Sequence, residues 1–204
     1  MTTNYYDNNA RDYFDSTAGV DMEPLYERFL PYVPIGGTIL DAGCGSGRDT
    51  KAFLHRGYVV TAMDASAEMA HLASAYTGLR VHHLPFEEME FASAFDAIWA
   101  SASLLHVPRS SMHAVLERLI AALQPGGICY MSFKLGDGER TEGGRYFNDQ
   151  NEVTLSEALS GFPNISIVEM WATKDRRPDL SDLIWLNCIL RKSNIGQDRY
   201  RAAR

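Results

Sequence analysis

The chain has 204 residues, of which 46% are hydrophobic and 22% are charged, as is ordinary for one packed globular domain. Its formal charge of −7 argues against long nucleic acid as the main partner, because phosphate binding needs a basic surface. No apolar run approaches the ~20 residues that span a bilayer, and the N-terminal MTTNYYDNNARDYFD lacks the basic and apolar regions of a signal peptide, so we expect a cytoplasmic protein.

Residues 1–34 are expected to form helices that lead into the main fold. One of them should begin near Asp21, with Pro24 in its first turn, and end at Pro31 and Pro34. From residue 35 onward, short apolar strands and amphipathic helices alternate. The expected strands are TILDAG, YVVTAMD, a short segment at 79–82, FDAIWAS and ICYMSFK, and the expected helices are 46–56, SAEMAHLASAY and SSMHAVLERLIAALQ. This alternation predicts an α/β fold with a parallel sheet and helices on both faces.

The C-terminal third is expected to finish the sheet. A polar, glycine-rich loop over 136–144 precedes a predicted helix at 154–160 and two β-rich runs, ISIVEMWATKD and LIWLNCILRK. Because no helix-length crossover separates these two runs, the last strand should be antiparallel. We expect the core to cover 35–192 and a basic tail to follow at 193–204. The basic residues near this end (Arg191, Lys192, Arg199, Arg201 and Arg204) favour a solvated, partly frayed segment.

The cysteine and histidine pattern gives no metal site. None of the three cysteines is in a CxxC spacing, and Cys129 and Cys188 lie in apolar runs where a thiol is usually a small buried hydrophobe. His82 and His83 are adjacent, so on an extended chain they should point in opposite directions.

A glycine-rich turn follows the first strand, in Asp41-Ala42-Gly43-Cys44-Gly45-Ser46-Gly47-Arg48. Glycines let a backbone turn sharply and approach a ligand closely, and ligands of open α/β sheets bind at the carboxyl ends of the strands. A dinucleotide site wants G-x-G-x-x-G, whereas here Arg48 stands in place of the third glycine, and no Gly-Lys-Ser/Thr of a P-loop is present. The loop therefore favours a ligand without a pyrophosphate.

Asp64 ends the second strand. A carboxylate there can accept hydrogen bonds from both hydroxyls of a ribose. By itself Asp64 could equally be the N-cap of the next helix, but beside the glycine loop ribose recognition is the better interpretation.

With these features the sequence closely resembles the class I S-adenosylmethionine-dependent methyltransferases. The resemblance is carried by ILDAGCGSGR, VTAMDAS, FDAIWASASLLHV and LQPGGICYMSF, in the expected order over roughly residues 35–135. The N-terminal Tyr6-Asp7-x-x-Ala10-x-x-Tyr13 is similar to the cap helix of small-molecule members, and the loop and fourth-strand exit resemble tellurite-resistance-type enzymes. The resemblance implies a Rossmann-like, seven-stranded, mostly parallel sheet with an antiparallel last strand, and S-adenosylmethionine as the cofactor, released as S-adenosylhomocysteine.

The resemblance also implies a set of cofactor contacts. Gly43 to Gly45 would lie along the methionine and ribose, Asp64 would take the ribose hydroxyls, and Ala65 and Met69 would flank the adenine. Phe86 and Glu87 stand where many relatives carry an acidic and a small residue for the adenine edge. In full, the residues assigned to the cofactor are Tyr6, Tyr13, Asp41, Gly43, Cys44, Gly45, Arg48, Asp64, Ala65, Met69, Phe86, Glu87, Ala100, Ser101 and Leu105.

Methyl transfer from a sulfonium is an in-line displacement, so the protein mainly supplies alignment and exclusion of water. His106 follows the fourth strand and could accept a proton from the acceptor as a catalytic base, or it could be a structural histidine bonded within its loop. The acceptor contacts are expected from Arg145, Tyr146 and Arg177, although the loop that holds the first two could be solvated. Trp171 and Trp185 alternate in apolar strands, which favours the core.

Three other functions stay open. A nucleic-acid (RNA) methyltransferase is disfavoured by the acidic charge and by Ala-Ser-Ala-Ser at the fourth-strand exit, where enzymes that modify exocyclic amines carry Asn/Asp-Pro-Pro-aromatic. A sensor or partner subunit that binds S-adenosylmethionine without catalysis would share the same loop. An NAD-dependent oxidoreductase is disfavoured by the glycine spacing. Fold and cofactor do not fix the identity of the acceptor, because the acceptor is bound by the variable opening of the active site.

Overall fold

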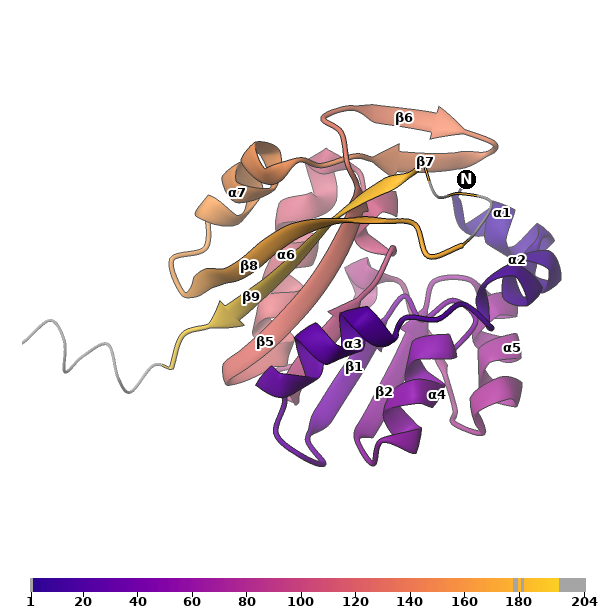
Figure 1. Ribbon diagram of the computed structural model, residues 1–204, viewed down its shortest axis with the longest axis horizontal. Coiled ribbons are helices and arrows are strands. Elements are labelled where there is room, and N and C mark those ends of the chain that lie inside the picture. The colour runs from indigo at the N-terminus through magenta and orange to yellow at the C-terminus, as the bar shows by residue number, and fades with distance from the viewer. Residues whose placement is uncertain (1, 178–179, 181, 195–204) are drawn as a thin grey trace, which may run out of the picture.

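A computed structural model describes residues 2–177, 180 and 182–194 as an α/β structure built on a seven-stranded sheet (Figure 1). The strand order is β3-β2-β1-β4-β5-β9-β8. The strands are β1 (Thr38–Ala42), β2 (Val59–Asp64), β3 (His82–His83), β4 (Phe95–Ala100), β5 (Leu123–Lys134), β8 (Ile165–Lys174) and β9 (Ile184–Lys192). Strand β9 pairs antiparallel with both β5 and β8, and the other pairs are parallel, which confirms the predicted fold class. The strand order reverses between β1 and β4, where ligands of such sheets bind.

Helices cover both faces of this sheet. They are α1 (Thr2–Asn8), α2 (Ala10–Thr17), α3 (Glu23–Phe29), α4 (Arg48–His55), α5 (Ala67–Thr77), α6 (Arg109–Ala122) and α7 (Glu152–Ser160), with short 3-10 turns η1 (Leu30–Tyr32), η2 (Phe86–Glu88) and η3 (Leu104–His106). Successive strand residues point to opposite faces, so each inner strand supplies two apolar surfaces. Helix α4 begins two residues later than expected, because Gly47 at its N-cap has a left-handed φ of 77°.

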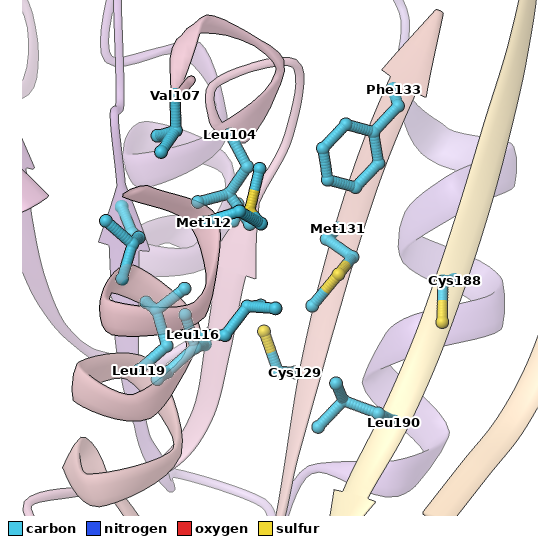
Figure 2. Close-up of a cluster of buried hydrophobic side chains, with 14 of the residues drawn as sticks. Leu104, Val107, Met112, Leu116, Leu119, Cys129, Met131, Phe133, Cys188 and Leu190 are labelled. Carbon is cyan, nitrogen blue, oxygen red and sulfur yellow. The ribbon is translucent and has the colours of Figure 1, made fainter. Parts of the chain in front are cut away.

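The core on one face lies between α6 and the centre of the sheet. Figure 2 shows Met112, Leu116 and Leu119 beside Cys129, Met131 and Phe133, with Cys188 and Leu190 further along the sheet. Cys129 and Cys188 are buried at 1% and 0% exposure, which confirms that they serve as small hydrophobes. On the opposite face, aromatic side chains from α3, α4, β4 and β5 pack together; they are Tyr26, Phe29, Phe53, Trp99 and Tyr130.

The sequence prediction was wrong about the glycine-rich segment at 136–144. It contains the first strand and the turn of a β-hairpin. The hairpin is formed by β6 (Glu139–Glu142) and β7 (Arg145–Asn148), which pair as a separate two-stranded sheet. Gly143 and Gly144 make the turn with φ of 56° and 77°, values that a two-residue hairpin turn requires and that glycine adopts freely. The hairpin lies beside the N-terminal helix α1, where the Thr2 hydroxyl accepts a hydrogen bond from the Tyr146 backbone N–H (Figure 1).

The basic C-terminal segment also differs from the expectation. Arg191 and Lys192 belong to β9, and Lys192 is buried, with its ammonium donating hydrogen bonds to the carbonyls of Ile120 and Leu123. Two carbonyl partners make this buried position favourable for a lysine, which the composition of the segment does not reveal. The rest of the predicted tail, with Arg199, Arg201 and Arg204, lies outside the described residues. No helix in the described part of the chain is long and apolar enough to cross a membrane.

Candidate active site

The glycine loop turns the chain from β1 toward α4 by backbone hydrogen bonds. The N–H groups of Gly43 and Cys44 both donate to the Met63 carbonyl, at 2.8 and 2.9 Å. Gly43 has a φ of 79°, and a Cβ there would lie 2.4 Å from the Cβ of Ser103, so no other residue fits without moving the backbone. The turn therefore depends on glycine at this position for both conformation and space.

Asp64 lies at the end of β2, directly beside this loop. One carboxylate oxygen accepts the Gly45 N–H at 2.8 Å and the other accepts the Ser66 N–H at 2.9 Å. The N-cap of α5 is Ser66, whose hydroxyl accepts the Met69 N–H, so the N-cap alternative for Asp64 was wrong. Burial raises the pKa of Asp64, while the two N–H groups oppose that rise.

Two adjoining cavities open at the carboxyl ends of the strands. The smaller has a volume of about 170 Å³ and the larger about 470 Å³. Both are lined by residues of the cap helices, the glycine loop and the exit of β4, namely Tyr6, Tyr13, Gly43, Gly45, Ala102 and His106. A ligand that crosses this shared boundary would therefore contact both cavities.

The predicted cofactor residues divide between the two cavities. Those in the smaller one, besides the shared tyrosines and glycines, are Asp64, Ala65, Met69, Phe86 and Glu87. Those in the larger one are Cys44, Arg48, Ser101 and Leu105. Asp41 and Ala100 are buried at 1% and 0% exposure and line neither cavity. They therefore lie beneath the residues that line the cavities.

A buried polar network beneath the glycine loop holds Arg48. The Arg48 guanidinium donates to both oxygens of Asp49, at 2.7 and 2.9 Å. Asp49 also accepts the Tyr26 hydroxyl at 2.5 Å and the Trp99 indole N–H at 2.8 Å. Burial opposes the ionisation of Asp49, but Arg48 and these donors hold its pKa below the ordinary value. Asp49 was not among the predicted site residues, although an acidic residue next to Arg48 in the first turn of a helix was a usable signal.

Asp41 belongs to the same buried region. It accepts the Thr50 hydroxyl at 2.5 Å, which joins the end of β1 to the first turn of α4. Burial and the neighbouring Asp49 raise the pKa of Asp41. Asp41 thus stabilises the glycine loop by joining the two elements that flank it, β1 and α4.

His106 is held in one tautomer by its two neighbours. Its Nδ1 lies 2.6 Å from the Tyr146 carbonyl oxygen, which can only accept, so Nδ1 carries the proton. Its Nε2 therefore accepts the Tyr6 hydroxyl proton, at 2.8 Å. Burial lowers the pKa of His106 to about 4, and burial followed by the nearby Tyr13 raises the pKa of Tyr6. Both side chains are consequently neutral near pH 7.

The three predicted acceptor residues have different surroundings. Arg145 lines the larger cavity between the rings of Tyr5 and Phe147, at 4.6 and 5.2 Å from their centroids. Arg177 also lines it, but is paired with Asp175 at 2.6 Å. The Tyr146 side chain donates to Glu139 and lines neither cavity, so its contribution to the site is the carbonyl that holds His106.

Trp185 was expected in the core, and it packs against the core while also contributing to the cavity wall. It is half-buried and lines the larger cavity, with its indole N–H donating to Asp175 at 3.0 Å. Trp185 lies near the start of β9, where the sheet meets the cavity. Lys134, at the end of β5, lines the same cavity.

Comparison with protein families agrees with this geometry. The model of a methyltransferase domain matches residues 39–127, from β1 through the turn before the apolar part of β5. A ubiquinone biosynthesis O-methyltransferase of Xanthomonas campestris is 31% identical over 104 residues, which cover 48% of this chain and 43% of that protein. An uncharacterized methyltransferase of Staphylococcus carnosus is 24% identical over 156 residues, 72% of this chain and 75% of that protein. The chain thus spans less than half the length of the first of these relatives.

A solved structure matches over more of the chain. It is the 1,6-didemethyltoxoflavin-N1-methyltransferase of Burkholderia thailandensis, with bound 1,6-didemethyltoxoflavin and S-adenosylhomocysteine. The TM-score is 0.73 at 28% identity, and the match covers 93% of this chain and 84% of that one. The similarity therefore extends beyond the glycine loop to both flanks of the sheet.

Proposed function

We propose that this chain, which has a class I S-adenosylmethionine-dependent methyltransferase domain, transfers the methyl group of that cofactor to a small-molecule acceptor. The observation that carries the proposal is the pair of cavities that meet at the glycine loop. One has a half-buried carboxylate, that of Asp64, at a strand end beside apolar walls, as a nucleoside requires. The other is larger and has cations and aromatic rings, as an acceptor site requires.

The residues present fit the cofactor. Gly43 leaves open the backbone approach that a Cβ would close. In this assignment Asp64 binds the ribose hydroxyls, Ala65, Met69 and Phe86 enclose the adenine, and Glu87 lies at the adenine edge. The larger cavity holds the methionine end along Cys44, Gly45 and Ser101, with Leu105 as an apolar wall. Arg48 would contribute shape more than charge, since Asp49 already neutralises it.

When bound, the cofactor supplies an activated methyl group on a sulfonium. The chain's part is to align an acceptor in line with that methyl and to exclude water, tasks that suit Tyr6 and Tyr13 at the boundary of the two cavities. A proton leaving the acceptor could reach His106 through Tyr6. The Tyr6 oxygen would accept it while the Tyr6 hydroxyl proton moves to Nε2, which is an available acceptor because His106 is neutral. In this role His106 is a positioning residue for Tyr6.

The test of cofactor binding is calorimetry with S-adenosylhomocysteine and with NAD. We expect the wild type to bind the former and not the latter, and Asp64→Asn to weaken binding by about tenfold or more, because a carboxamide offers a single acceptor oxygen. Asp15→Asn, on an exposed carboxylate of α2, is the matched control and should bind like the wild type. Equal affinity of all three proteins would contradict the assignment of Asp64, and no affinity in the wild type would contradict the proposed function.

A small acceptor is favoured over nucleic acid because the neighbour from Burkholderia thailandensis contains a small-molecule acceptor and matches this chain over 93% of its length. Release of S-adenosylhomocysteine in the presence of a panel of metabolites would separate an enzyme from a non-catalytic sensor. The relation to tellurite-resistance-type enzymes and the cytoplasmic location stay predictions.

A further inference from the structure

Two partly buried cations in the larger cavity lack the partners that their neighbours have. A third cation without an ion pair in the described part of the chain, Lys174, lines this cavity at an exposed position. Among the described residues, Arg48, Arg176 and Arg177 each form an ion pair with an aspartate, at 2.7, 2.9 and 2.6 Å. Lys134 and Arg145 line the same cavity and form no ion pair in the described part of the chain. The Nε of Arg145 is buried without a hydrogen-bond acceptor. A buried donor without a partner is unfavourable, so such an atom indicates a missing ligand group.

Lys134 and Arg145 lie together with Arg140 around one aromatic ring. The Lys134 ammonium lies 3.9 Å from the centroid of Phe147, and the guanidinium carbons of Arg140 and Arg145 lie at 4.7 and 5.2 Å. Arg140 is paired with Asp149 and Glu142, at 3.3 and 3.8 Å. The three positive side chains around Phe147 are thus accompanied by two carboxylates. This leaves an excess of one positive charge in a partly buried region. One negative charge on a ligand would balance this excess.

Aromatic side chains line the cavity next to these cations. Tyr13 and Trp185 line the cavity together with Phe147, and His106 packs against Phe147 with 5.2 Å between the ring centroids. Aromatic faces bind planar ring systems by stacking. His106 and Tyr6 lie at the boundary toward the smaller cavity, so a ring held here would also reach the position where the two cavities meet.

We infer that the larger cavity selects an acceptor with a planar ring and a single negative charge, and that Arg145 and Lys134 bind the charged group. This inference rests on the proposed function. The charged group is distinct from the methylated atom, because cations in contact with the nucleophile would make it less reactive. Arg145 and Lys134 are thus specificity residues, set beside the reacting atoms.

The test compares 3,4-dihydroxybenzoate with 3,4-dihydroxybenzamide, which have the same ring but differ in charge. Binding of each is measured by calorimetry, with and without S-adenosylhomocysteine. We expect the wild type to prefer the benzoate by about tenfold, as hydrogen bonds to charged groups commonly provide. Arg145→Gln and Lys134→Met should each remove most of this preference and leave the affinity for S-adenosylhomocysteine within about twofold.

Matched controls separate this effect from a change in total charge. Arg80→Gln and Lys51→Met remove the same charges outside both cavities, and should keep the preference for the benzoate. The inference is overturned if the wild type does not bind the benzoate at millimolar concentration, or binds both probes equally. It is also overturned if Arg145→Gln weakens S-adenosylhomocysteine instead, since Arg145 would then serve the cofactor's carboxylate. Failure of the wild type to bind S-adenosylhomocysteine is a separate result that would refute the proposed function itself.

Discussion

At the scale of single residues, His106 links three segments that are far apart in the chain. Its ring joins Tyr6 in α1 to the carbonyl of Tyr146 in β7, from a position just after β4. In the neutral ring Nδ1 carries the proton that the carbonyl accepts and Nε2 accepts the Tyr6 hydroxyl, whereas protonation would turn Nε2 into a donor and reverse its bond with Tyr6. The protonation state of one side chain therefore affects how the cap and the hairpin are held over the cavities.

This linkage predicts that acid weakens the fold through His106. Its pKa in the folded protein is about 4, below the ordinary 6.5, so the unfolded chain binds the proton more readily. Stability is then fully present above about pH 6.5 and is lost as the pH falls toward 4. Between pH 7 and pH 5 this contribution should fall by about 1–2 kcal/mol, as urea unfolding would measure.

His106→Gln should remove this part of the pH dependence, whereas His71→Gln, at an exposed position of α5, should keep it. If the two variants lose stability in parallel over this pH range, His106 does not control it.

At the scale of elements, the hairpin β6–β7 is held in place by Arg109 at the start of α6. The Arg109 side chain donates to Asn148 Oδ1 and to the carbonyls of Asp137 and Asp149, at 2.9, 2.7 and 2.9 Å. A planar guanidinium can serve several acceptors in fixed directions, whereas an ammonium is a compact point charge. The hairpin also supplies Arg145 and Phe147 to the larger cavity, so its anchor affects the acceptor site without touching it.

We expect Arg109→Lys to loosen the hairpin while the sheet stays folded. Amide hydrogen exchange over 139–148 should become faster by about tenfold, if the lost hydrogen bonds contribute about 1–2 kcal/mol. Exchange in β1 and β4 should stay unchanged, as should the affinity for S-adenosylhomocysteine. Faster exchange spread evenly over the whole sheet would instead mean that Arg109 stabilises the fold globally.

The same hairpin shows what could be predicted from the sequence and what could not. Most strands of the main sheet were predictable because each has a run of apolar residues, and the glycine loop and Asp64 follow this pattern in a recognisable order. The exception is β3, the two exposed residues His82 and His83, which overlap the expected 79–82 segment at one position only. The strands β6 and β7 carry charged and aromatic residues without a clear apolar face, so only the turn residues Gly143 and Gly144 signalled them. The partners of His106 were not predictable either, because they come from positions 100 and 40 residues away.

At the scale of the whole molecule, β9 closes the structure by entering the sheet between β5 and β8. This antiparallel strand places Trp185 at the cavity end and Lys192 at the opposite end of the same strand. There the Lys192 ammonium donates to the carbonyls of Ile120 and Leu123, near the end of α6, at 2.7 and 2.6 Å. One end of the last strand is thus held by the Lys192 side chain at the junction of α6 and β5, and the other end reaches the site.

Lys192→Met should therefore destabilise the whole fold. The variant keeps the apolar stem but leaves two buried carbonyls without this donor, which should cost about 1–3 kcal/mol. We expect the midpoint of urea unfolding to fall while its slope, which reports the surface exposed, stays the same. Lys174→Met, at an exposed position on β8, is the matched control and should change stability by less than about 0.5 kcal/mol. Because Lys192 lies at the opposite end of β9 from the cavities, the folded variant should bind S-adenosylhomocysteine like the wild type. A loss of affinity in the folded variant would show that β9 transmits strain along its length to the site.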